Sequence, residues 1–179
     1  MIFVPVLTTP RLRLRGFDVR DFEPLAEMLA HPDLARVLGD GRSIDRAEAW
    51  RRLAGILGHW VLRGHGLWAL EERASGAFAG WAGLIQPEGW PALEIAYSLA
   101  RPFWGRGYAR EAAAASLAYA HETLHRTEVI SIIRPANLGS IRVATALGAT
   151  RAETIDFFGA PSDVYRYPLP AGVASRAQA

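Results

Sequence analysis

A glycine-rich stretch, Trp104-Gly105-Arg106-Gly107-Tyr108-Ala109, is the part of the sequence best suited to bind an anion. It lies between an expected strand and an expected helix, where free backbone N–H groups and the positive end of the helix dipole meet. Gly105 and Gly107 allow close approach to a phosphate, and Arg106 and Arg110 add charges that pH does not remove. A plain strand-to-helix turn also favours glycine, so the hexapeptide alone leaves both interpretations open.

Two common phosphate-binding motifs do not fit this loop. The loop of nucleotide hydrolases, GxxxxGK followed by Ser or Thr, requires a lysine, and all 20 basic residues of this chain are arginine. The GxGxxG spacing of dinucleotide-binding proteins is not matched either. A nucleotide-binding regulator is therefore disfavoured.

The loop resembles the signature Q/R-x-x-G-x-G/A of GNAT acetyltransferases. Gly107 and Ala109 occupy its two small positions, and Trp104 replaces the usual Gln or Arg. Residues 9–15, 94–99 and 137–142 resemble the RimJ/RimL-like branch of that family, and the resemblance spans about residues 8–169.

The resemblance implies an α/β (α+β) fold: a mixed, mostly antiparallel sheet of six to seven strands flanked by about four helices. It also implies that acetyl-CoA is the co-substrate, that the loop amides hold its pyrophosphate, and that Asn137 holds the pantetheine arm. The residues expected to bind CoA are Tyr97, Ser98, Leu99, Trp104, Gly105, Arg106, Gly107, Tyr108, Ala109, Arg110, Asn137 and Ser140.

Glu94 and Ser140 are the candidate catalytic residues. The family carries a glutamate at the start of this strand, where Glu94 could take the proton of an amine directly or through water; a structural ion pair is the alternative. A backbone N–H of residues 97–99 would polarise the thioester carbonyl. Ser140 matches the serine that this branch places near the leaving thiol; its alternative role is that of an ordinary first-turn helix residue.

His31, Trp81 and Phe158 are candidate residues of the acceptor pocket. His31 ends the first expected helix, where the family often lines this pocket, and it is a weaker rival to Glu94 as the base. A surface histidine and core aromatic side chains are the structural alternatives. In strict alternation Glu94 shares a face with Ala96 and Ser98, and a bulge expected in this family would change that facing.

Hydrophobic periodicity, capping residues and turn residues predict the elements that position these groups. We expect strands at 11–15, 67–71, 77–85, 93–99, 128–133, 150–158 and 163–169, and helices ending near 30, at 45–63, ending near 124, and at 138–147. Ser43 is the expected cap of the second helix, with Trp50, Leu53, Leu57 and Trp60 facing the core. The arginines of the first strand are expected to face water or a ligand.

Length and composition narrow the class of protein. The 179 residues fit one domain, placed at 8–169, with 170–179 as a flexible tail. The absence of cysteine excludes disulfides and thiolate metal sites, and the histidines lack metal-ligand spacing, so no metal is expected. A net charge of +2 is too small for a nucleic-acid binder, and without a signal sequence or a membrane segment we expect a cytoplasmic protein.

The leading functional hypothesis is an acetyl-CoA-dependent N-acetyltransferase acting on a primary amine, above all the N-terminal α-amine of a protein or peptide, as for ribosomal proteins. A small-molecule amine or antibiotic acetyltransferase is the first alternative. A non-catalytic acyl-CoA-binding sensor is the alternative from another class. The expected partners are acetyl-CoA and the amine acceptor, with a homodimer left open.

Overall fold

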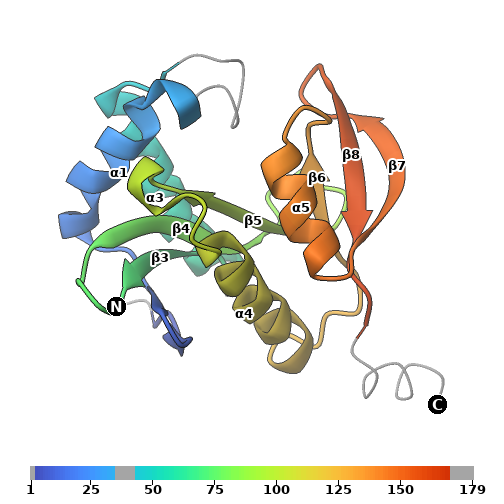
Figure 1. Cartoon of the computed structure of the whole chain (residues 1–179), viewed down its shortest axis with the longest axis horizontal. Helices are drawn as coiled ribbons and strands as arrows, with labels where there is room; N and C mark the ends of the chain where they lie inside the picture. The colour runs from blue at the N-terminus through green and yellow to red at the C-terminus, as the bar shows by residue number, and fades with distance from the viewer. Residues whose placement is uncertain (1–2, 35–42, 170–179) are drawn as a thin grey trace.

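In the computed structural model, which describes residues 3–34 and 43–169, eight strands form one sheet in the order β1-β2-β3-β4-β5-β6-β8-β7 (Figure 1). Neighbouring strands pair antiparallel, except that β5 and β6 run parallel. The strands are β1 (Leu7–Thr8), β2 (Leu12–Arg15), β3 (Leu67–Glu72), β4 (Phe78–Ile85), β5 (Leu93–Leu99), β6 (Val129–Ile133), β7 (Thr150–Asp156) and β8 (Pro161–Arg166). The expected fold class is confirmed; the additional strand, β1, is too short to show a period-two pattern.

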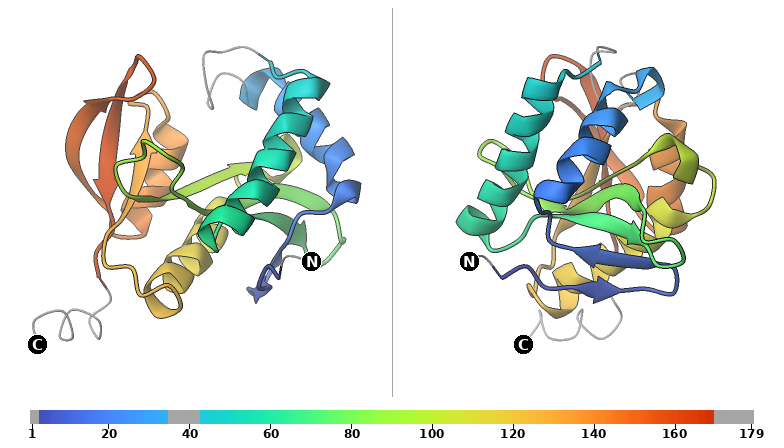
Figure 2. Two further views of the ribbon diagram at one scale, coloured as in Figure 1. Left: turned by 180° about the vertical axis from the view of Figure 1, so that it is seen from behind. Right: turned by 90° about the vertical axis from the view of Figure 1, so that its left-hand side faces the viewer.

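Helices cover both faces of the sheet (Figure 2). They are α1 (Phe22–Ala30), α3 (Arg46–Arg63), α4 (Tyr108–Glu122) and α5 (Leu138–Ala146). Successive residues of β3 alternate between two cores, as a strand requires. Leu67 and Ala69 pack with α1 and α3, whereas Trp68 and Leu70 pack with α4. No helix of the described residues is long and apolar enough to cross a membrane.

Three local predictions are wrong. Asp45, not Ser43, caps α3, because its side chain accepts a hydrogen bond from the Glu48 N–H at 2.8 Å. Trp50 is 52% exposed on that helix, although Leu53 and Trp60 are buried as expected. The final hairpin turns at residues 157–160, so β8 begins at Pro161, inside the segment expected to be the turn.

Arg15 contradicts the expectation that the arginines of the first strand face water or a ligand. Its side chain is buried between two carboxylates, with Nη1 at 2.7 Å from Asp21 Oδ2 and Nε at 2.8 Å from Glu71 Oε2. The two carboxylates replace the water that a buried guanidinium loses. The tail expected at 170–179 lies outside the described residues.

The sheet separates at the pairing of β5 with β6, and this separation creates the space for a site. Only two residue pairs, Leu93 with Val129 and Glu94 with Ile130, join these strands within the described chain. Beyond them β5 continues along β4, and β6 continues along β8. Figure 1 shows the resulting two parts, with β6, β7, β8 and α5 on one side and β1 to β4, α1 and α3 on the other.

Candidate active site

A cavity of about 600 Å³ lies where β5 ends and α4 and α5 begin. Its lining comes from the end of β5, the glycine-rich loop and the first turns of both helices. The lining residues are Leu34, Tyr97, Ser98, Leu99, Trp104, Gly105, Gly107, Tyr108, Ala109, Arg110, Ala136, Asn137, Leu138, Gly139, Ser140, Arg142 and Val143. Every residue predicted to bind CoA is in this set except Arg106.

The glycine-rich loop has the backbone geometry that an anion site needs. Gly105 and Gly107 have φ values of 74° and 77°, in the left-handed region where glycine is favoured. Gly107 is the N-cap of α4 and supplies no side-chain cap, so the first N–H groups of the helix remain available. A Cβ on Gly105 would meet nothing within 4 Å, so a phosphate can approach the backbone there.

The charge beside this cavity differs from the predicted one. Arg106 turns away from the cavity: its Nη1 lies 3.3 Å from Glu72 Oε1, and its guanidinium lies over the Phe103 ring. Arg110 lines the cavity as predicted, and Arg142, which was not predicted, lines it as well. The arginines that face this cavity therefore come from the first turn of α4 and from α5.

Arg11 fixes the loop from a distant part of the sequence. Its Nη1 donates to the Arg106 carbonyl oxygen at 2.7 Å, and its Nε donates to Glu111 Oε2 at 2.6 Å. Glu111 also accepts from the Arg11 N–H at 2.8 Å and from the Thr9 hydroxyl at 2.6 Å. Glu111 is thus the centre of a network that holds residues 9–11 against the loop, and not only a negative charge at a helix N-terminus.

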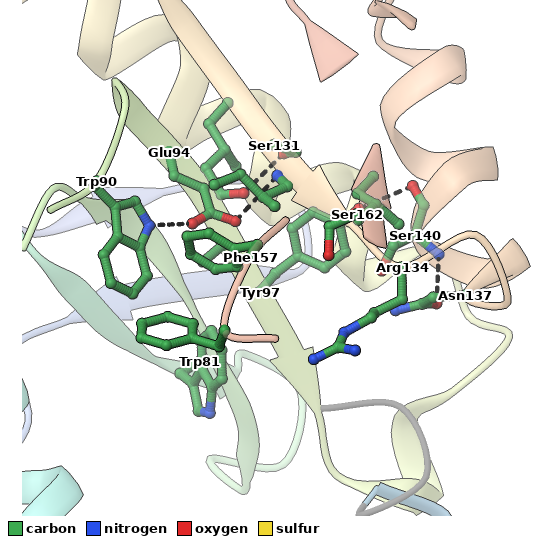
Figure 3. A pocket seen from close by; sticks show the side chains of 15 residues that line it. Trp81, Trp90, Glu94, Tyr97, Ser131, Arg134, Asn137, Ser140, Phe157 and Ser162 are labelled. Carbon is green, nitrogen blue, oxygen red and sulfur yellow. Dashed lines mark hydrogen bonds between the residues drawn. The ribbon is translucent and has the colours of Figure 1, made fainter. Parts of the chain in front are cut away.

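A second cavity, of about 240 Å³, lies beside Glu94 (Figure 3). Its lining residues are Trp81, Trp90, Glu94, Ile95, Ala96, Tyr97, Ser131, Ile132, Ile133, Arg134, Asn137, Ser140, Phe157, Phe158 and Ser162. Tyr97, Asn137 and Ser140 line both cavities. The two cavities therefore meet at β5 and the start of α5.

Glu94 is 8% exposed and accepts two hydrogen bonds. Trp90 Nε1 donates to Oε2 at 2.5 Å, and the Ile132 N–H donates to Oε1 at 3.2 Å. Burial raises the pKa of Glu94 to about 7, against the opposing effect of these two bonds. Glu94 has no ion pair among the described residues, which removes the structural ion pair as an explanation. Its carboxyl group can bind or release a proton near neutral pH.

The facing of Glu94 follows strict alternation. The ladder between the described strands β4 and β5 runs from Gly80–Leu99 to Ile85–Glu94 without a register shift, so the expected bulge is absent from it. Ala96 packs in the core beneath α1 and α3, as Trp81 does, and Ile95 packs in the core that includes α4. Glu94 therefore faces the side of the sheet that carries Trp81.

The backbone of β5 supplies hydrogen-bond donors at the separated edge. The Ile95 carbonyl accepts from Ser131 Oγ at 2.8 Å, and the Leu99 carbonyl accepts from Trp104 Nε1 at 2.7 Å. The N–H and C=O groups of one strand residue point to the same edge of the strand, and so do those of the residues two positions away. Tyr97 lies between Ile95 and Leu99 in this pattern, so its N–H points into the space between β5 and β6. It could stabilise negative charge on a carbonyl oxygen there.

Asn137 and Ser140 occupy the start of α5. Asn137 Oδ1 accepts from the Ser140 N–H at 3.0 Å, so this side chain caps the helix. The Tyr97 hydroxyl donates to the Ser140 carbonyl at 3.1 Å and ties β5 to α5. Ser140 is thus placed at the junction of the cavities, where it could contact a sulfur atom.

Aromatic side chains form one wall of the smaller cavity. The Trp90 ring lies 4.9 Å from the Phe157 ring and 5.5 Å from the Phe158 ring, measured between centroids. Phe158 has a φ of 51° and is 75% exposed, an unfavourable conformation for a bulky residue without the compensation of burial. With Gly159 it forms a two-residue turn in which both φ values are positive, as in a type I′ hairpin. This turn holds the Phe158 ring against Trp90.

Of the three residues predicted to line the acceptor pocket, two line a cavity and one does not. Trp81 and Phe158 line the smaller cavity with Glu94, whereas His31 lines neither cavity. His31 is exposed at the end of α1, and its Nδ1 accepts a hydrogen bond from the Asp33 N–H at 3.2 Å. Leu34, three residues later, is the part of this segment that reaches the larger cavity.

Sequence reasoning missed Trp90, Ser131, Arg134 and Phe157 in the smaller cavity. Trp90 lies in the turn at 86–91, which was interpreted only as a break between strands. The adjacent Phe157-Phe158 pair before a glycine was the available signal, because a strand that ends in two aromatic residues cannot bury both on one face.

Comparison with known proteins identifies the family. A profile described as "Acetyltransferase (GNAT) domain" matches residues 11–150. The chain belongs to the GNAT acetyltransferase family. It is 34% identical over 167 residues to the protein YkkB of Bacillus subtilis, covering 89% of this chain and 93% of YkkB. It is 30% identical over 167 residues to the FsC-acetyl coenzyme A-N(2)-transacetylase of Aspergillus fumigatus, covering 84% and 67% respectively.

A solved GNAT-like structure agrees with the fold. The acetyltransferase from Agrobacterium tumefaciens superposes with a TM-score of 0.84 and 30% identity, covering 93% of this chain and 96% of that protein. As a GNAT protein the chain is an acyltransferase, and enzymes of this family use acetyl-CoA. The open loop backbone at Gly105 and the larger cavity fit a pyrophosphate and a pantetheine arm.

The Arg11 network gives a first prediction. Arg11→Gln is expected to weaken acetyl-CoA binding about 10-fold, because it removes a charged hydrogen bond, worth about 1.5 kcal/mol, that fixes the loop. Turnover at saturating acetyl-CoA should stay near the parent value. Arg13→Gln is the matched control, since Arg13 is an exposed neighbour whose carboxylate partner lies 3.7 Å away. Calorimetry of both variants decides: equal affinity in Arg11→Gln and the parent would contradict the role.

Proposed function

We propose that this GNAT enzyme transfers the acetyl group of acetyl-CoA to a primary amine bound beside Glu94. One observation carries the proposal: a carboxyl group with a pKa near 7 lies in a cavity that shares Tyr97, Asn137 and Ser140 with the cavity of the glycine-rich loop. A base with that pKa suits proton transfer at neutral pH.

The proposed reaction has three parts. The amine nitrogen forms a bond to the thioester carbon, and the Tyr97 N–H stabilises the charge that develops on the carbonyl oxygen. Glu94 takes the proton that the nitrogen loses. The C–S bond then breaks, and the CoA thiolate takes up a proton; a thiol with a pKa near 8.5 leaves with little help, so Ser140 needs only to hydrogen-bond the sulfur.

The leading acceptor is the N-terminal α-amine of a protein or peptide, on the basis of the RimJ/RimL-like residues at 94–99 and 137–142. A small-molecule amine is the second candidate, supported by the similarity to the fungal transacetylase. The small size of the acceptor cavity suits either one terminal residue or a compact amine, since pockets for drug-sized ligands occupy about 300–1,000 Å³.

A binding and turnover experiment tests this function. We expect 1 mM acetyl-CoA, at a micromolar Kd, to stabilise the protein by about 4 kcal/mol and to raise Tm by roughly 10 °C. Release of free thiol with a panel of peptides and amines should follow. A shift with ATP or NAD but none with acetyl-CoA would overturn the assignment, and a shift without thiol release would favour the non-catalytic sensor.

A further inference from the structure

Arg134 lies directly after β6. It lines the smaller cavity beside Glu94, which we call the acceptor cavity, and it does not line the cavity of the glycine-rich loop. Figure 3 shows Arg134 beside Asn137, apart from the Glu94 carboxyl group. The cavity therefore has a carboxyl group in one part and a guanidinium group in another.

The guanidinium of Arg134 has no partner among the described residues. Arg11, Arg15, Arg46, Arg101, Arg106, Arg151 and Arg166 each pair with a carboxylate. Arg110 and Arg142, which also lack a carboxylate partner in the described chain, face the larger cavity, where the phosphates of acetyl-CoA are expected. By the same reasoning, Arg134 is a cation without a counter-ion in the acceptor cavity.

A half-buried guanidinium recovers the hydration it loses when it binds an anion. Its planar set of N–H donors matches a carboxylate, with two parallel hydrogen bonds. The aromatic side chains of Trp81, Trp90, Phe157 and Phe158 line the same cavity, and surroundings of low polarity strengthen such a pair. The phosphates of CoA, which are expected at the glycine-rich loop, are an unsuitable partner for Arg134, because Arg134 does not line the larger cavity.

We propose that Arg134 recognises a carboxylate on the acceptor, so that the substrate is an amine that also carries a carboxylate group. This inference rests on the proposed function, because it takes the cavity beside Glu94 as the acceptor site. The amine would lie toward Glu94 and the carboxylate toward Arg134. Two sources share this chemistry: a free amino acid, and a peptide with an acidic side chain near its N-terminus.

Paired acceptors test the proposal. One pair is phenylalanine and phenylalaninamide; the other is Ser-Glu-Ala-Ala-amide and Ser-Gln-Ala-Ala-amide, in which the glutamate carries the sole carboxylate. We expect the carboxylate member of one pair to have a kcat/KM about 10- to 100-fold higher than its neutral partner. The pair that shows the preference identifies the source of the carboxylate.

The variant Arg134→Gln is expected to abolish this preference by raising KM, with the Kd for acetyl-CoA unchanged, and Arg134→Lys should restore part of it. Arg126→Gln is the control, since Arg126 is exposed and lines neither cavity. Equal kcat/KM within both pairs in the parent, or an undiminished preference in Arg134→Gln, would overturn the proposal.

A binding measurement separates this inference from the proposed function. If no amine is turned over, calorimetry with CoA present still compares the carboxylate and neutral members of each pair on the parent and on Arg134→Gln. Binding of the carboxylate members that depends on Arg134 would support the carboxylate site while the proposed function fails. Binding that does not depend on Arg134 would overturn the inference.

Discussion

Glu94→Gln is expected to keep the affinity for acetyl-CoA and to lower turnover at pH 7 by about 10²- to 10⁴-fold, the usual contribution of a general base. The variant keeps the size of the side chain and loses its ability to take a proton. Stopped assays of thiol release, together with calorimetry, measure the two quantities separately. An unchanged rate at pH 7 in a folded variant that binds acetyl-CoA would rule out Glu94 as the base.

The pH profile of this variant also reports on the acceptor. In the parent, the rate should rise as pH increases through about 7, because Glu94 must be ionised to accept a proton. In Glu94→Gln only the ionisation of the amine remains. An α-amine, with a pKa of about 7.8, is about one-seventh neutral at pH 7 and mostly neutral by about pH 9, so the rate of the variant should rise about 7-fold and then level off. A lysine amine, with a pKa of about 10.4, would still be mostly protonated.

Protein stability provides an independent readout of the same carboxyl group. The pKa of Glu94 rises from 4.5 in the unfolded chain to about 7 in the folded one, because burial disfavours the charged form. The contribution of this pKa shift to the free energy of unfolding is therefore fully present below pH 4.5, where Glu94 is protonated in both states, and it is lost as pH rises through 7. At 1.36 kcal/mol per pKa unit the loss is about 3 kcal/mol. Denaturant unfolding at pH 5 and pH 8 should show most of this loss in the parent and not in Glu94→Gln.

Gly107→Val is expected to weaken acetyl-CoA binding by about 10- to 100-fold, the effect of losing one charge-assisted hydrogen bond from the loop amides. The φ of 77° at Gly107 is unfavourable for a β-branched residue, and a Cβ there would lie 3.4 Å from Arg11 Nη2. The substitution therefore disturbs both the loop backbone and the residue that fixes it.

Gly76→Val is the matched control for this change. Gly76 has a φ of 72°, and a Cβ on it would meet nothing within 4 Å. It lies in the turn between β3 and β4, so the substitution carries a similar backbone strain without touching the loop. If calorimetry shows that folded Gly107→Val binds acetyl-CoA as tightly as Gly76→Val does, the loop is only a turn.

The parts of the molecule that depend on local pattern could be predicted from the sequence. The alternation of β5 gave the facing of Glu94, and the glycine spacing gave the loop and the start of α4. Both follow from the geometry of consecutive residues. The cap of α3 was harder, because Ser43 and Asp45 are both good caps and only the helix start decides between them.

Long-range pairings could not be predicted. Arg11 and Glu111 are 100 residues apart, and nothing in either segment identifies the other as its partner. Arg15 looked like a solvated residue because its two carboxylates, Asp21 and Glu71, meet it only after the sheet forms. Trp90 was missed for the same reason: a turn has no periodicity that shows which buried group its side chain will contact.

Because only two residue pairs join β5 to β6 in the described chain, a bound ligand can contribute contacts across this part of the sheet. A molecule in the larger cavity touches Tyr97 on one side of the separation and Ser140 on the other, so it bridges the two parts of the sheet where few backbone hydrogen bonds do. A ligand there would add contacts between the two parts, which in the described residues already meet through the two-pair ladder and through the hydrogen bonds from Ser131 to Ile95 and from Tyr97 to Ser140.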